Sequence, residues 1–280
     1  MSFADAHFRS LGRPLKTPPH LAASGVDPDG LYVLWAGAND LLAASDPEAA
    51  VVDAVSHLAD CLVALASGGA QHIVVPNMPN PKRTPLVIAQ GAEAAAGAEL
   101  LSAAFNAGLH DVIQNIEGAF GIDVIEPDTF TLLDTIVTQH FRFGIFVTQI
   151  PALSETLEVA THPDRFAFWD AVHPTRVVHE IAGDDWTVLA AASLARSHLD
   201  SLVAAGSLGA SAASTIRSRL NTAFARVAEV RPHLAAERVE AAAVRAVLLV
   251  LLGALDWSDA VPYIQAAAVA HRAVWTSVID

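Results

Sequence analysis

The sequence FWDAVHPT at residues 168–175 is the stretch on which the interpretation of the whole chain depends. It places an acid, Asp170, three residues before His173, and Pro174 follows at once. A carboxylate beside an imidazole is two thirds of a nucleophile-activating triad, because the acid orients the ring and stabilises its cation. Proline restricts the preceding residue to extended conformations, so we expect His173 on a bend and not inside a helix. An acid and a histidine at this spacing are also common by chance, so a second signal is needed.

The second signal is LYVLWAGAND at residues 31–40, an apolar run that ends in small and polar residues. It predicts a buried strand over residues 31–36 that opens into a loop at its carboxyl end. Open α/β sheets bind ligands at the carboxyl ends of their strands, so this loop is a candidate for part of a site. Asn39 and Asp40 also fit a second interpretation, in which they only cap the following helix.

These two stretches resemble two sequence blocks of the SGNH, or GDSL-type, lipases and esterases. The G-x-N-D block is matched by residues 37–40 and the D-x-x-H-P block by residues 170–174, in the family's order and at about its separation. The resemblance covers roughly residues 20–183 and implies an α/β fold, a three-layer α/β/α arrangement around a parallel sheet. It also implies the roles of four residues: His173 is the general base, Asp170 orients it, Asn39 stabilises the oxyanion, and Gly37 shapes the oxyanion loop.

One part of the family pattern is not matched. In this family the nucleophile is the serine of an N-terminal G-D-S-L block, and a second block then supplies a glycine N–H to the oxyanion hole. Here the chain begins MSFAD, which makes Ser2 the candidate nucleophile, but no strand precedes it. The chain between Ser2 and Asn39 is also too short for the second block. The sequence therefore predicts an SGNH fold that is truncated at its N-terminus.

Composition indicates a packed globular protein. The 280 residues suit one large or two ordinary domains, and 53% of them are hydrophobic while 16% are charged. The formal charge of −14 argues against nucleic acid or an acidic membrane surface as a partner. The first residues are mixed and polar, so we expect no signal peptide, and the most apolar run, residues 246–255, is too short for a transmembrane segment. The compartment stays open, although related enzymes are often secreted.

Helical and strand patterns alternate through the first two thirds of the chain. The acid–proline–acid sequence at residues 46–48 is typical of a helix start, and Gly68-Gly69 ends that helix. The loop after the next strand contains Asn77 and resembles a loop that borders the substrate cleft in related hydrolases. We expect helices at 46–67, 91–119, 129–137 and 175–182, and strands at 31–36, 72–77 and 122–125.

Residues 184–280 have a different character from the rest of the chain. They contain few prolines or glycines, and their apolar residues recur at helical spacing. We expect an all-α helical bundle with helices at 186–205, 210–228, 234–255 and 258–278, and therefore two domains, 1–183 and 184–280. The bundle can pack on the hydrolase domain or serve as an association surface.

The 12 histidines raise the question of a metal site, but their spacings do not support one. The sequence contains neither an H-E-x-x-H motif nor a cysteine pair, and His162-Pro163 lacks an acid three residues earlier. There is also neither a phosphate-binding glycine loop nor a G-x-S-x-G elbow. We therefore expect no metal ion and no organic cofactor.

Two functions follow from these observations. The first is a carboxylic-ester hydrolase that acts on a small-molecule ester or lipid through an acyl-enzyme, with Ser2 as the nucleophile if the chain supplies one. The second is a catalytically inactive SGNH-like protein that binds an acyl ester or a protein partner, with the helical region as its interaction module. A missing N-terminal strand would leave a sheet edge unpaired, so we also expect a homo-oligomer.

Overall fold

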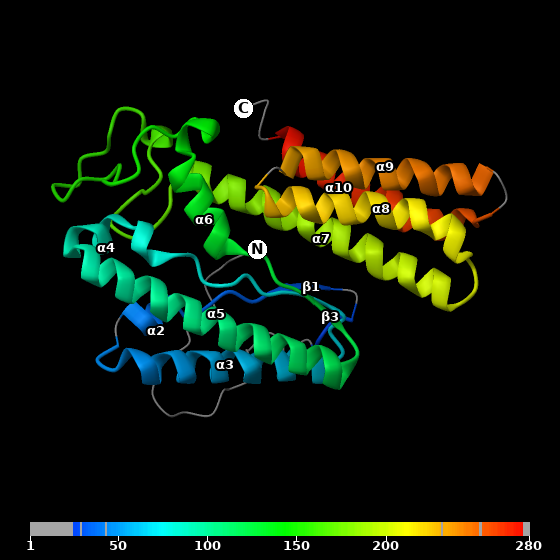
Figure 1. Ribbon diagram of the computed structural model, residues 1–280, viewed down its shortest axis with the longest axis horizontal. Coiled ribbons are helices and arrows are strands. Elements are labelled where there is room, and N and C mark those ends of the chain that lie inside the picture. The colour runs from blue at the N-terminus through cyan, green and yellow to red at the C-terminus, as the bar shows by residue number, and fades with distance from the viewer. Residues whose placement is uncertain (1–24, 29, 43, 231, 252–253, 277–280) are drawn as a thin grey trace. The chain divides into compact units, whose positions relative to one another are not determined.

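The computed structural model describes residues 25–28, 30–42, 44–230, 232–251 and 254–276. The chain divides into two compact units between Thr175 and Arg176. The first unit is an α/β structure with a small parallel sheet, and the second is built of helices in the residues described (Figure 1). Ser2, the candidate nucleophile, lies outside the described residues.

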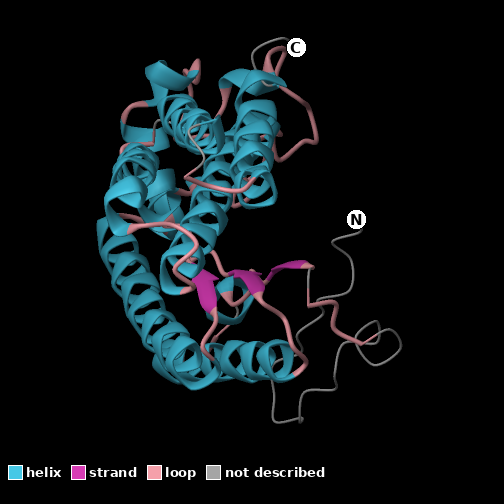
Figure 2. Ribbon diagram, turned by 90° about the vertical axis from the view of Figure 1, so that its right-hand side faces the viewer, coloured by secondary structure: helices cyan, strands magenta, loops and turns pink. Residues whose placement is uncertain are grey.

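The first unit is built around three short parallel strands, β1 (Leu31–Val33), β2 (His72–Val74) and β3 (Asp123–Ile125). They lie side by side in the order β1-β2-β3, as Figure 2 shows in magenta. The pairing register aligns Tyr32 with Ile73 and Val124. Each strand was expected, and each is shorter than the apolar run that predicted it. The backbone hydrogen bond from Leu34 N to Val74 O, at 2.9 Å, continues the pairing one residue beyond β1.

Long helices pack against the core of this sheet. The helices α3 (Pro47–Ser67) and α5 (Ala92–Phe120) contact each other, and both contribute to the hydrophobic core that also buries Ile73 and Val124. The predicted start of α3 is confirmed, because Asp46 caps it by accepting a hydrogen bond from Ala49 N at 3.1 Å. Gly68 caps its carboxyl end, as the sequence predicted.

Shorter elements complete the first unit. The connection after β2 contains the 3₁₀ turn η1 (Pro81–Arg83) and the helix α4 (Pro85–Gln90), which were not predicted. The predicted helix after β3 is α6 (Thr129–Thr138). The helix α2 (Ala38–Leu42) directly follows the glycine loop of β1, and the turns η2 (His140–Phe143) and η3 (Pro163–Arg165) interrupt the loops after α6.

The prediction that the first strand is buried is wrong for one of its faces. Tyr32 packs on the core of the unit, but Leu31 and Val33 are about half exposed, at 49% and 53%. The physical reason is the strand order: β1 lies at the end of the described sheet and pairs with β2 alone. An apolar run of this kind does not reveal whether its strand will be central or at an edge.

The second unit is a bundle of the helices α7 (Arg176–Ala204), α8 (Ala210–Ala228), α9 (Pro232–Leu251) and α10 (Trp257–Thr276). Its core is rich in alanine, and this small side chain lets the helices approach closely. The predicted break between helices at 175–182 and 186–205 is wrong, because α7 runs through this region without interruption. Gly183 lies within α7, and a Cβ at this position would meet no neighbouring atom. The predicted domain boundary at 183/184 lies inside this helix and stays a prediction.

One helix of the described residues, α3, has the length and apolarity of a membrane-spanning segment. Core helices of water-soluble domains meet the same criterion, and α3 places Leu58, Leu62 and Leu65 in the core of the first unit. The length and composition of α3 are therefore only weak evidence that it crosses a membrane.

Candidate active site

The acid–histidine pair has a defined geometry. Oδ2 of Asp170 lies 2.8 Å from Nδ1 of His173, while Oδ1 accepts hydrogen bonds from the backbone N–H groups of Val172 and His173 at 2.8 and 2.7 Å. The spacing of three residues makes this arrangement possible, since one carboxylate oxygen closes the turn and leaves the other free to face the ring. Asp170 therefore determines both the backbone turn and the orientation of the imidazole.

The turn itself is anchored on both sides. Trp169 N donates to His173 O at 2.8 Å, and Thr175 N donates to Ala167 O at 3.0 Å. Phe168 within this small loop is completely buried, so apolar packing also fixes the segment. A further hydrogen bond, from Leu86 N in α4 to Ala171 O at 2.9 Å, ties the turn to the connection that follows β2.

The pKa of Asp170 lies below its ordinary value. Partial burial acts in the opposite direction and is the largest single influence, but the backbone hydrogen bonds from His173 and Val172, together with the His173 ring, outweigh it. Asp170 is therefore ionised at neutral pH and able to stabilise a histidine cation. Its hydrogen bond to Nδ1 favours the tautomer in which Nε2 is free to accept a proton. The His173 side chain is 74% exposed, so the ring is open to solvent.

The glycine loop after β1 is held in a conformation that only glycine readily adopts. Gly37 is buried with φ of +108°, and a Cβ there would approach Cε2 of Phe105 to 2.7 Å. Asn39 lies in the first turn of α2 and is exposed, and its side chain makes no hydrogen bond to any described residue. Asp46, and not Asn39 or Asp40, caps α3, so the capping interpretation fails for that helix.

The loop after β2 is fixed by two asparagines. Oδ1 of Asn77 accepts a hydrogen bond from Phe130 N at 2.9 Å, and its Nδ2 donates one to Asp128 at 3.1 Å. These two bonds join the loops after β2 and β3.

Asn106 of α5 forms two hydrogen bonds with the backbone of Met78. Its side chain accepts from the Met78 N–H at 2.7 Å and donates to the Met78 carbonyl at 3.0 Å. Sequence reasoning missed Asn106. A polar residue directly after Phe105 on the buried side of an apolar helix is the signal that could have identified it.

These contacts link the loops at the carboxyl ends of the strands. Gly37 lies against Phe105, and the Cβ it lacks would stand 3.6 Å from Met78. Met78 belongs to the loop that leads through η1 and α4 to the hydrogen bond with Ala171. The structure thus brings Asp170 and His173 into direct contact and connects their turn to the Gly37 loop. Asn39 hydrogen bonds to neither member of the pair, and Ser2 lies outside the described residues.

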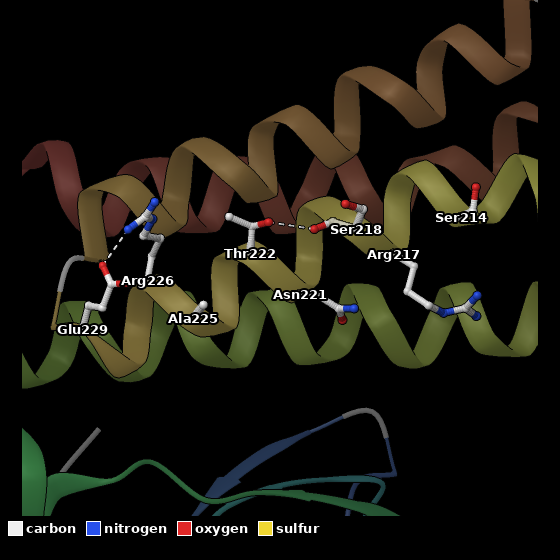
Figure 3. Close-up of a pocket in the computed structure, with 8 residues that line it drawn as sticks. All are labelled: Ser214, Arg217, Ser218, Asn221, Thr222, Ala225, Arg226 and Glu229. Atoms are coloured by element: carbon white, nitrogen blue, oxygen red, sulfur yellow. Dashed lines mark hydrogen bonds and ion pairs between the residues drawn. The ribbon is translucent and has the colours of Figure 1, made fainter.

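A separate hollow lies in the helical unit. It has a volume of about 510 Å³ and is lined by residues of α8 and by Glu229, which follows this helix (Figure 3). Its two arginines are already engaged: Arg217 pairs with Asp200 at 2.5 Å and Arg226 with Glu229 at 2.6 Å. Its one carboxylate, Glu229, is paired with Arg226, and no described histidine, cysteine or lysine lines the hollow. Among the described residues no group of three or more histidine, cysteine or acidic side chains is arranged to hold a metal ion.

Comparison with known proteins identifies one family. The sequence model of the GDSL-like lipases and acylhydrolases matches residues 11–186, a range that includes the Gly37 loop and the Asp170–His173 pair. A search of curated proteins found no match.

The close approach at Gly37 predicts a specific sensitivity. Gly37→Ala should destabilise the first unit by about 1 kcal/mol or more, because it forces alanine to a positive φ and drives a methyl group into Phe105. Gly97→Ala is the matched control: Gly97 lies within α5 with open space around it, so the substitution should stabilise by about 0.5–1 kcal/mol. Urea unfolding measures both variants. Equal effects would contradict the steric role of this position.

The lowered pKa of Asp170 predicts a pH dependence of stability. The folded state favours the ionised carboxylate, so its contribution is fully present above the unfolded-state pKa and is lost as the pH falls through the folded-state value. The difference in unfolding free energy between the parent and Asp170→Asn should therefore shrink below about pH 4. Chemical unfolding at several pH values tests this. A difference that stays constant from neutral to strongly acidic pH would show that the carboxylate gains nothing from its hydrogen bonds.

Proposed function

The chain belongs to the GDSL-like lipase/acylhydrolase family, whose members are hydrolases of esters, and from this premise we propose that it cleaves carboxylic esters through an acyl-enzyme. The observation that carries the proposal is the Asp170–His173 pair, with its 2.8 Å hydrogen bond and exposed ring. The substrate is a small-molecule ester or a lipid. Neither a metal ion nor an organic cofactor takes part in the proposed reaction.

The proposed reaction has two acyl-transfer steps. A serine hydroxyl gives its proton to Nε2 of His173 while its oxygen bonds to the ester carbonyl carbon, and the carbonyl electron pair moves to oxygen. The intermediate collapses, the ester C–O bond breaks, and the imidazolium returns the proton to the departing alcohol. Water then repeats the sequence and releases the acid. Asp170 stays ionised throughout and stabilises the imidazolium that forms in each step.

Asn39 and Ser2 take the remaining roles in this proposal. The exposed Asn39 amide donates to the developing oxyanion, an interaction typically worth about a hundredfold or more in rate. Ser2 is the proposed nucleophile, because the start MSFAD places a serine where the family's N-terminal block supplies one. It lies before the family match at residues 11–186. The three-layer α/β/α arrangement of the family belongs to the same proposal, with the described sheet and its helices as the part that supports it.

The alternative is a catalytically inactive protein that binds an ester or another protein. Within the described residues, no serine, threonine or cysteine side chain hydrogen bonds to the ring of His173. The pair would then recognise a ligand without forming a covalent intermediate, and the two functions differ in a single measurable property, turnover.

Hydrolysis of short-chain nitrophenyl esters tests the proposed function. We expect activity in the parent, a loss of about 10³-fold or more in both His173→Ala and Ser2→Ala, and a loss in Asp170→Asn that leaves KM little changed. His162→Ala is the matched control, because His162 is an exposed histidine that also precedes a proline in the same loop segment. It should retain activity within about twofold.

Each outcome has a distinct meaning. Activity lost in His173→Ala and kept in Ser2→Ala would assign the nucleophile to another group. A folded parent with no activity above background would reject the esterase and favour the inactive binding protein. An equal loss of activity in His162→Ala would show that His173 has no specific role in the reaction.

We also propose that chains associate through the outer edge of β1. Within the described residues β1 pairs with β2 alone and exposes Leu31 and Val33, and edges of this kind favour pairing with another chain. Light scattering should detect a homo-oligomer that Val33→Lys weakens. The control is Val52→Lys, at a valine of α3 that is 68% exposed, and it should have no effect. A monodisperse monomer of the parent chain would contradict the proposal.

A further inference from the structure

The loop segment between α6 and α7 exposes an unusual concentration of large apolar side chains. Single exposed hydrophobic residues are ordinary, but several close together mark an interaction surface. Figure 1 shows this part of the chain, residues 139–175, as irregular loops beyond the end of α6. Six side chains, hereafter the exposed loop hydrophobics, have exposed fractions from 38% to 78%: Phe141, Phe146, Ile150, Leu157, Val159 and Trp169.

Backbone contacts place these residues on one packed loop structure. The rings of Phe141 and Phe146 lie 5.7 Å apart, edge to face. Phe146 N donates to Arg165 O at 2.7 Å, where residues 145–153 begin to run beside residues 165–169. At the other end, Leu153 forms a bridge with Val159 and donates to Trp169 O at 2.8 Å. The exposed side chains are therefore carried by a single hydrogen-bonded framework.

Leu157 is the most exposed of the six and has the least favourable backbone. It lies in the tight turn from Ser154 to Glu158 with φ of +63°, a conformation suited to glycine or asparagine. The turn is closed by hydrogen bonds from Ser154 N to Glu158 O at 2.9 Å and from Glu158 N to Ser154 Oγ at 3.0 Å. At this position leucine is neither buried nor in a backbone conformation that it readily adopts. An apolar environment outside the chain would account for it, because strained residues cluster at functional sites.

One of the exposed loop hydrophobics, Trp169, borders the candidate active site. Trp169 directly precedes Asp170, and its backbone N–H donates to His173 O at 2.8 Å. Any apolar phase that contacts Trp169 therefore lies beside the acid–histidine pair.

We propose that the exposed loop hydrophobics insert into the surface of neutral or zwitterionic lipid aggregates and bring the Asp170–His173 pair to esters held there. The statement about esters rests on the proposed function, whereas the statement about docking does not. A lipid surface fits better than a protein groove or strand, since the segment contains only isolated β-bridges and short 3₁₀ turns among its described residues. The described residues of this segment therefore have no strand edge or helix face on which a folded protein partner could dock. A fluid lipid phase needs no such surface.

Charge selects the kind of lipid. Residues 139–175 contain four acids and two arginines, a net −2 with neutral histidines, within a chain of formal charge −14. Anionic lipid would therefore be repelled, and neutral or zwitterionic headgroups are the chemistry that this surface tolerates.

Flotation with dioleoylphosphatidylcholine vesicles tests the proposal, with His173→Ala as the background so that turnover plays no part. The double change Ile150→Ser and Leu157→Ser should lower the vesicle partition coefficient by at least about tenfold, because two large apolar side chains no longer leave water. The matched control is Val52→Ser with Leu100→Ser, which removes two side chains that are 68% and 72% exposed on α3 and α5. It should change partition by less than about twofold.

A second variant separates docking from folding. Leu157→Gly should raise the free energy of unfolding, because glycine relieves the positive φ, and should lower vesicle partition at the same time.

If vesicle binding is found while the parent lacks esterase activity, the proposed function fails and the docking surface stands. Absence of vesicle binding, equal losses in the test and control doubles, or binding to phosphatidylserine vesicles alone would overturn the proposal. The proposal would also be overturned if the parent bound no vesicles but self-associated, and if Ile150→Ser with Leu157→Ser abolished that self-association. The surface would then bind a second copy of the chain.

Discussion

The hydrogen bonds accepted by one carboxylate, that of Asp170, are the interaction on which the site depends. One oxygen accepts two backbone N–H groups and closes the turn, and the other holds the imidazole of His173. The same bonds lower the pKa of the acid and so keep its charge opposite the ring. Backbone shape, ring orientation and local charge therefore have a common origin. Removing this acid would alter all three together.

The parallel sheet supplies the second constraint. Parallel strands deliver their following loops to one edge, and here those loops are fastened to one another. Asn77 joins the loops after β2 and β3, Asn106 fixes Met78, and Gly37 fits against Phe105 because it has no side chain. Leu86 then connects this assembly to the turn that carries His173. The sheet has only three short strands in the described part of the chain, yet it is sufficient to position these loops.

The sequence predicted much of this arrangement, and its failures have physical causes. The bend at His173, the cap of α3 and the order of helices and strands were predictable, because each follows from local chemistry such as proline restriction, side-chain capping and apolar periodicity. The exposure of Leu31 and Val33 was not, because it depends on which strands pair in space. The continuity of α7 through Gly183 was also missed, since a single glycine only weakens a helix locally, and packing of the residues on both sides can keep it helical. Asn106 acts through a loop 28 residues earlier, and no local pattern reveals such a contact.

The central claim is that His173 activates a serine for attack on an ester. A fluorophosphonate probe tests it most directly, since an activated hydroxyl displaces fluoride and keeps the phosphonyl group, which intact-protein mass spectrometry detects. The account predicts one adduct, located on Ser2 by peptide mapping and absent from His173→Ala. A folded chain that forms no adduct, or an adduct that persists unchanged in His173→Ala, would contradict it.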